Sequence, residues 1–72
     1  MQQVTIVYEW SDDGWWVAEV AEVPGAISQG RTKEEARANV LSALGLLLEA
    51  RRELALQRVH SPASVETVTL AN

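Results

Sequence analysis

A single amphipathic helix is the strongest pattern in this chain, and it limits what the remaining residues can form. Between residues 33 and 54, apolar side chains recur at the three- and four-residue spacing of one helix face. Thr32 and Glu35 stand at its start with the Thr-x-x-Glu spacing of a capping box, in which both side chains accept bonds from unpaired backbone N–H groups. We therefore predict one helix over residues 33–54 that lies on a sheet. Its apolar stripe comprises Ala36, Val40, Ala43, Leu44, Leu47, Ala50 and Leu54, with Leu41 and Leu48 beside it.

The residues before this helix have the two-residue alternation of β-strands. Residues 4–10 and residues 15–21 both alternate, and a cluster of turn formers at residues 11–14 separates them. The two runs therefore predict an antiparallel hairpin. Because successive strand residues point to opposite faces, the adjacent Trp15 and Trp16 are expected on opposite sides of the sheet.

Two further segments complete the predicted sheet. Pro24 and Gly25 form a turn, because proline lacks a backbone donor and glycine permits a sharp bend. A short third strand at 26–29 follows and ends at Gly30, and the β-branched residues 65–70 predict a closing strand. The expected fold is α+β with the order βββαβ, in two layers: an antiparallel sheet covered by one long helix.

Size and composition exclude several classes of protein. The 72 residues accommodate a single domain, 1–72, and the absence of cysteine excludes disulfide scaffolds, thiolate zinc sites and cysteine nucleophiles. Ten acidic against six basic residues give a net charge of −4, which disfavours nucleic-acid binding and suits a basic protein partner. The longest apolar-rich run, residues 40–48, is far shorter than the ~20 residues that span a bilayer, and no leader pattern precedes it. We expect a cytoplasmic protein without membrane association.

Few residues offer catalytic or metal-binding chemistry. His60 is the only histidine and has no cysteine or histidine partner, so a solvent-facing loop residue is favoured over a metal ligand. Asp12 and Asp13 are explained by turn chemistry at the hairpin tip. A two-metal nuclease site would require them to converge with Glu9 and Glu19. We expect no catalytic residue, no bound metal and no cofactor.

Three tryptophans and one mid-helix glycine are candidates for contact surfaces. Trp10, Trp15 and Trp16 flank the hairpin; one interpretation buries two of them in a thin core and lays the third over an edge. The other interpretation makes Trp15 an interface anchor, because it faces away from the Trp16 row. Gly45 lies on the polar side of the helix, where glycine costs about 1 kcal/mol relative to alanine. It is either a neutral substitution or a place where a second backbone approaches in an oligomer.

Several of these segments occur together in one known family. The runs Trp-Val-Ala-Glu-Val at 16–20, Val-Pro-Gly at 23–25 and Ser-Gln-Gly-Arg-Thr-Lys-Glu-Glu-Ala at 28–36 closely resemble the HicB-like antitoxin family. The shared pattern is an aromatic-x-Ala strand, a Pro-Gly turn, a short strand ending in glycine, and Thr-x-Glu-Glu-Ala opening a long helix. The resemblance covers about residues 4–54 and extends to the Ser-Pro loop and the last strand. It implies a βββαβ fold with a partial ribonuclease-H-like sheet.

The resemblance also implies a role in a toxin–antitoxin system. Such antitoxins are not enzymes; they bind a small basic HicA-type ribonuclease toxin and mask its active surface. Many full-length members add a C-terminal DNA-binding domain, which is not found here after the last predicted strand, so no direct DNA binding is expected. From charge and facing alone, the predicted partner-binding residues are Trp15, Glu9, Asp12, Asp13, Glu19 and Glu22.

The sequence also bears on oligomeric state and on two alternative functions. A 72-residue chain without disulfides buries little apolar surface, so we expect a homo-oligomer, a dimer or a tetramer. The alternative function is a vestigial or metal-dependent ribonuclease-H-like nuclease, which needs converging carboxylates. A metabolite-binding module would need a sizeable apolar pocket, which a thin two-layer domain hardly provides.

Overall fold

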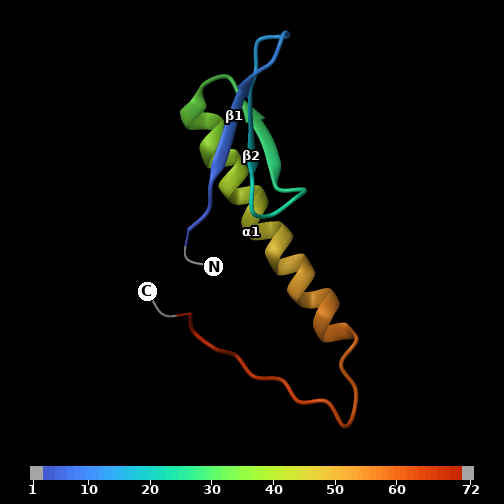
Figure 1. Cartoon of the computed structure of the whole chain (residues 1–72). Coiled ribbons are helices and arrows are strands. Elements are labelled where there is room, and N and C mark those ends of the chain that lie inside the picture. The colour runs from blue at the N-terminus through green and yellow to red at the C-terminus, as the bar shows by residue number, and fades with distance from the viewer. Residues whose placement is uncertain (1–2, 71–72) are drawn as a thin grey trace.

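The structure, a computed structural model, describes residues 3–70 and contains three strands followed by one helix (Figure 1). Strands β1 (Ile6–Trp10), β2 (Trp16–Val20) and β3 (Ile27–Gly30) form an antiparallel sheet in the order β1-β2-β3, and helix α1 spans Lys33–Gln57. The α+β class, with an antiparallel sheet covered by one long helix, is confirmed. Residues 1–2 and 71–72 of the predicted domain lie outside the described part.

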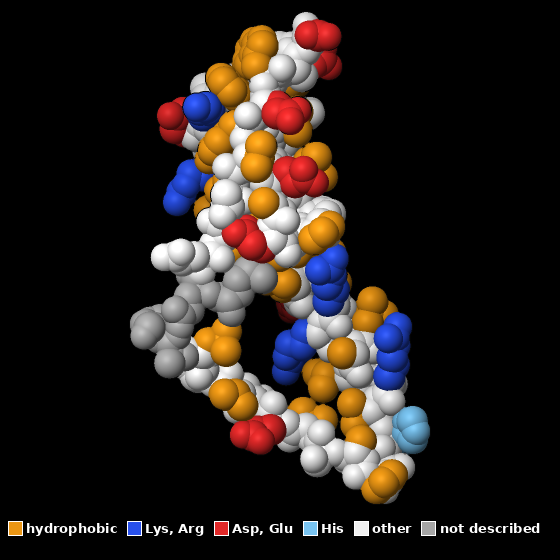
Figure 2. All heavy atoms as spheres, in the orientation of Figure 1, with side chains coloured by type: hydrophobic (Ala, Val, Ile, Leu, Met, Phe, Trp, Pro, Cys, Tyr) orange, Lys and Arg blue, Asp and Glu red, His pale blue; other side chains and the backbone are white. Residues whose placement is uncertain are grey.

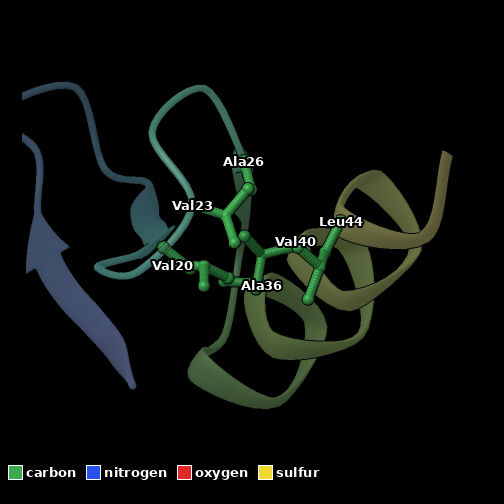
Figure 3. Close-up of a cluster of buried hydrophobic side chains, with 7 residues drawn as sticks. Val20, Val23, Ala26, Ala36, Val40 and Leu44 are labelled. Carbon is green, nitrogen blue, oxygen red and sulfur yellow. The ribbon is translucent and has the colours of Figure 1, made fainter. Parts of the chain in front are cut away.

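The pairing register decides which side chains face the helix. Tyr8 pairs with Ala18, and Ala18 pairs with Ser28, so these side chains share one face of the sheet. Figure 3 shows how buried residues of this face, of the β2–β3 loop and of α1 point toward one another. The core is small: Val20 and Val40 are its largest fully buried side chains. It consists of Ala18, Val20, Val23, Ala26, Ala36, Val40 and Leu44.

Both sheet turns use glycine where the backbone requires it. Gly14 ends the first hairpin loop with φ of 86°, and Gly25 has φ of 96°, a region that side chains with a Cβ rarely adopt. The Ala26 N–H donates to the Val23 carbonyl at 3.1 Å, so Pro24 and Gly25 occupy the central positions of a β-turn. The predicted roles of Pro24 and Gly25 are confirmed.

The start of α1 is fixed by two side-chain hydrogen bonds and one close approach. The Thr32 hydroxyl accepts from the Glu35 N–H at 3.0 Å, and Glu35 Oε1 accepts from the Arg31 N–H at 3.1 Å. The reciprocal bond of this capping box therefore goes to the residue before the N-cap. A Cβ on Gly30 would lie 2.5 Å from the Ala36 nitrogen, so only glycine lets the end of β3 approach the first helical turn this closely.

Helix α1 extends beyond the sheet. Of its predicted stripe, Ala36, Val40 and Leu44 are buried, whereas Leu54 is 52% exposed. The helix ends at Gln57 rather than at residue 54, and its last turns carry the chain away from the strands (Figure 1). Within residues 3–70, no helix combines the length and apolar content needed to cross a lipid bilayer.

The prediction of a closing strand at 65–70 is wrong. This segment is extended and exposed along its whole length, and it pairs with no strand of the described chain. The β-branched composition favours an extended backbone, but a strand also needs a partner edge within reach. The chain leaves the end of α1 beyond the sheet, turns, and runs back as an isolated extended segment that joins no strand of the described sheet (Figure 1).

Substitution by alanine should have opposite effects on the stability of the fold at two of the glycines. Gly30→Ala should destabilise the fold by about 1–3 kcal/mol, because its Cβ would overlap the helix backbone. Gly45→Ala, whose Cβ would meet nothing within 4 Å in this protomer, should stabilise it by about 0.5–1 kcal/mol through helix propensity. Urea denaturation followed by circular dichroism measures both. A loss of stability in Gly45→Ala would contradict this and favour the predicted backbone contact at that position.

Candidate functional site

The side of the sheet opposite α1 has no second layer in the described chain. Three apolar residues lie there: Val7 is 46% exposed, Ile27 is 52% exposed, and Val17 is half-buried. We call this surface the outer face. It comprises Val7 and Glu9 of β1, Val17 and Glu19 of β2, and Ile27 and Gln29 of β3, with Trp15 and Arg31 at one end.

Apolar and acidic side chains alternate across the outer face. Glu19, on the central strand, lies between Val7 and Ile27, and Glu9 pairs with Val17. Glu9 and Glu19 are therefore diagonal rather than directly opposite, which lessens their mutual repulsion. The outer face thus combines apolar side chains that a partner can bury with negative charge. This suits a partner that has basic side chains around an apolar centre.

Charge is divided unevenly along the chain. Residues 1–30 contain five acidic residues and no lysine or arginine, so this part carries the excess negative charge of the molecule. Figure 2 shows most acidic side chains over the sheet end, with most lysine and arginine side chains along the helix. The five are Glu9, Asp12, Asp13, Glu19 and Glu22, which are also the predicted partner-binding acids.

Glu22 has a structural role that the sequence did not indicate. Its Oε1 accepts from the Thr5 N–H and its Oε2 accepts from the Thr5 hydroxyl, both at 2.6 Å. These two bonds, the one from the hydroxyl first, hold the pKa of Glu22 below its ordinary value of 4.5. Glu22 thus joins the turn after β2 to the segment before β1, and its carboxylate stays charged.

Asp12 and Asp13 lie at the hairpin tip, apart from Glu22. The Ser11 hydroxyl donates to Asp13 Oδ1, and Ser11 Oγ also accepts from the Trp15 N–H at 3.0 Å. This network closes the turn, as the turn chemistry of aspartate and serine predicts. The structure therefore brings Glu9 and Glu19 together on one face and leaves Asp12 and Asp13 as exposed charges at its end.

The three tryptophans differ in their surroundings, and none is fully buried. Trp16 packs against the core, with Trp10 at its edge at 5.3 Å between ring centroids. Trp10 is 58% exposed, so the interpretation that buries two tryptophans in the core is wrong. Trp15 is half-buried on the outer face, and the Arg31 guanidinium lies 3.9 Å from its ring centroid. This cation–π contact holds the Trp15 ring in place.

Arg31 was missed by the sequence analysis. The β2–β3 register pairs Trp16 with Gly30, and continuing it by one residue places Arg31 across from Trp15. The pair could have been predicted only from the pairing register of β2 and β3. In the sequence, Arg31 stands between the end of a strand and the cap of a helix, where no periodic pattern indicates which face of the sheet its side chain lies on.

The residues predicted for other chemistries do not assemble into a site. Within residues 3–70, no three His, Cys, Asp or Glu side chains lie close enough to hold a metal ion. His60 is exposed beside the Arg58 carbonyl. One open hollow of about 180 Å³ is lined by Tyr8, Lys33, Glu34 and Arg37, which is smaller than the roughly 300 Å³ of common ligand pockets. The outer face is therefore the candidate site.

The lowered pKa of Glu22 predicts a pH dependence of stability. Because the folded-state pKa is lowered, this contact stabilises the fold above the ordinary pKa of 4.5 and is lost as the pH falls through the folded value. Thr5→Val, which removes only the hydroxyl bond, should raise the pKa of Glu22 in an NMR titration of the carboxyl carbon. Glu22→Gln should lose less stability than the original chain between about pH 6 and pH 3. An unchanged Glu22 titration in Thr5→Val would contradict this.

Comparison with known proteins places the chain in a family. It is 35% identical over 68 residues to the UPF0150 protein ssl0738 of Synechocystis sp., covering 94% of each chain. It is 35% identical over 46 residues to the UPF0150 protein Ta0767 of Thermoplasma acidophilum, covering 64% of this chain and 67% of that one. No family model and no solved structure matches it. Since the first relative is matched over nearly its whole length, the chain belongs to the UPF0150 family.

Proposed function

We propose that this protein is a HicB-like, antitoxin-type binding protein that masks a small basic HicA-type ribonuclease toxin through protein–protein contact. The observation that carries the proposal is the outer face: an uncovered sheet surface that combines Val7, Val17 and Ile27 with Glu9 and Glu19. A ribonuclease that binds RNA phosphates presents a basic surface. An acidic sheet face that also offers apolar area would bind this basic surface of the toxin and so compete with RNA for it.

The charge distribution supports fast and selective association. Five acids without a single lysine or arginine in residues 1–30 create a negative field at the sheet end. This field steers a basic partner toward the outer face and disfavours DNA or RNA as a direct ligand. The proposal places the protein in the cytoplasm, where the RNA targeted by such a toxin is located.

Trp15 is proposed as the anchor of this interface. Its ring is already fixed by Arg31 at 3.9 Å, so binding would order little additional side-chain freedom. Tryptophan side chains dominate binding energy where they are rigid and become fully desolvated. Trp10 is more exposed but lies on the helix side of the sheet, opposite Trp16, and is not part of the proposed interface.

The nuclease alternative receives no support from the arrangement of carboxylates. Asp12 and Asp13 are held in the turn network at the tip, and Glu9 and Glu19 are diagonal on the outer face. The ribonuclease-H-like character of the sheet remains a prediction from the resemblance.

The proposal is tested by coexpressing this chain with the product of the adjacent small open reading frame. The two should copurify as a defined complex, and adding this chain should suppress the toxin's cleavage of RNA at stoichiometric amounts. RNA cleavage that continues unchanged in the presence of excess chain would contradict the proposal.

Neutralising the acids of the outer face should slow association with the toxin. Glu9→Gln combined with Glu19→Gln should lower the association rate constant by about three- to tenfold and flatten its dependence on salt. Surface plasmon resonance at several ionic strengths measures both quantities. The control is Glu49→Gln with Glu53→Gln, two exposed acids of α1. Equal effects of the two double variants would show that net charge, and not the outer face, attracts the partner.

Removing the Trp15 ring should weaken the complex far more than removing the Trp10 ring. Trp15→Ala should raise the dissociation constant by at least about 30-fold, as for a hot-spot residue, whereas Trp10→Ala should change it by less than about threefold. Isothermal titration calorimetry measures the affinity, and far-ultraviolet circular dichroism checks that both variants fold. A larger loss in Trp10→Ala would move the interface to the other side of the hairpin.

A further inference from the structure

Strand β1 forms an open edge of the sheet. The Ala21 N–H donates to the Thr5 carbonyl, and the Ser11 N–H donates to the Trp15 carbonyl. In an antiparallel pair this means that the odd-numbered residues of the segment bond toward β2. The even-numbered residues therefore direct their backbone N–H and carbonyl groups outward from the edge; they are Ile6, Tyr8 and Trp10. No other strand of residues 3–70 pairs with these groups, and the extended residues 64–70 leave the edge free.

This edge also lacks the features that usually keep an edge strand from pairing. Proteins commonly protect such strands with several charges, a proline or a bulge. The sequence of β1, Ile-Val-Tyr-Glu-Trp, contains one charged side chain and no proline. The opposite edge is partly covered, because Asn39 Nδ2 donates to the Gln29 carbonyl at 2.8 Å. Of the two edges, β1 is therefore the one that can accept a further strand.

A basic hollow adjoins the β1 edge on the helix side. Helix α1 packs over β3 and β2, so the side chains of β1 on this side lie beside the helix and not beneath it. The open hollow of about 180 Å³ is lined by Tyr8, Lys33, Glu34 and Arg37. Lys33 Nζ lies 5.4 Å from the ring centroid of Tyr8 and 5.1 Å from that of Trp16, and these contacts hold its ammonium group at the hollow. Two positive charges against one negative charge make the hollow basic.

The spacing of the helix matches that of a strand added at this edge. Leu41 follows Arg37 by one turn, about 6 Å along the helix axis, and it is half-buried. Two residues of a β-strand span about 6.7 Å. An added residue opposite Tyr8 therefore has its side chain beside Arg37, and the residue opposite Ile6 has its side chain toward Leu41.

We propose that the β1 edge binds an extended segment of another protein as an additional strand, with an acidic side chain of that segment in the hollow between Lys33 and Arg37. The outward backbone groups supply the binding energy common to all such segments, and the hollow selects among them. The site is separate from the outer face and does not depend on the proposed toxin.

The residues beside the edge define the sequence that this site favours. The acidic residue stands opposite Tyr8, and an apolar residue stands opposite Ile6. Between and beside them, a β-branched residue opposite Val7 and a basic residue opposite Glu9 complement the outer side of the sheet. For an antiparallel strand, the more stable arrangement, the core of the segment reads basic, acidic, β-branched, apolar.

Charge favours such a segment over a second copy of this chain. Two β1 edges paired about Tyr8 would set the Lys33 and Arg37 side chains of both copies against each other. Like charges brought together at an interface weaken it. An acidic side chain in the hollow instead meets two opposite charges.

Calorimetric titration of this chain with a synthetic peptide tests the proposal. The peptide is Thr-Thr-Lys-Glu-Val-Leu-Thr, acetylated and amidated at its ends, and the control peptide has lysine in place of the glutamate. The glutamate peptide should bind at least about tenfold more tightly, because its carboxylate enters the hollow. Net charge alone predicts the reverse order, since the chain carries −4. Equal affinities, tighter binding of the lysine peptide, or no saturable binding at millimolar peptide would overturn the proposal.

Paired charge variants locate the binding of the glutamate peptide. Lys33→Gln combined with Arg37→Gln should lower the affinity at least about tenfold. The control is Arg52→Gln with Arg58→Gln, which makes the same change in net charge at two exposed residues outside the hollow and should lower it less than about twofold. Equal effects of the two double variants would overturn the assignment of the hollow.

N-methylation of the peptide distinguishes strand addition from attraction by charge alone. The N–H of the glutamate points toward β1 and that of the valine points away, because alternate residues of an antiparallel strand bond to one neighbour. Methylating the glutamate nitrogen should weaken binding at least about tenfold, and methylating the valine nitrogen less than about threefold. Equal losses would overturn strand addition. These measurements use this chain without the toxin, so a negative result would leave the toxin-binding proposal unaffected.

Discussion

The close approach of the helix start to the end of β3 determines the geometry of the rest of the molecule. Gly30 allows the strand to end against the first helical turn, and Thr32 with Glu35 satisfies the N–H groups exposed there. With this point fixed, Ala36, Val40 and Leu44 fall over the same face of the sheet. Small side chains at this contact keep the two layers close, so a core without a fully buried aromatic ring suffices to join them.

The same geometry leaves two kinds of surface uncovered. One helix can cover only one face of a three-stranded sheet, so Val7, Val17 and Ile27 remain on the outer face among acids. A helix of 25 residues is also longer than the strands it covers, so its stripe continues past them to Leu54. The outer face is acidic and suits a basic partner. The end of α1 and the β1 edge of the sheet are the other uncovered surfaces of the described chain.

The sequence predicted the elements whose signals are local. The two-residue alternation, the Pro24-Gly25 turn and the capping box each depend on neighbours within a few positions, so the three strands and the helix start were found within two residues. The opposite facing of Trp15 and Trp16 follows from the same alternation. The strand at 65–70 was wrong because its composition reports a preference for extended backbone, whereas a strand also needs hydrogen bonds to a neighbouring strand, and this segment joins none in residues 3–70.

By itself, therefore, the sequence determined the class of fold, the position of the helix cap and the acidic character of the sheet half. Only the tertiary structure decided that Glu9 and Glu19 share an uncovered face, that Glu22 is held by Thr5, and that Arg31 lies on the Trp15 ring. It also decided that the helix extends beyond the end of the sheet. The physical reason is range: periodicity and caps act between neighbours in the chain, whereas register and layer coverage arise from contacts between residues far apart in it.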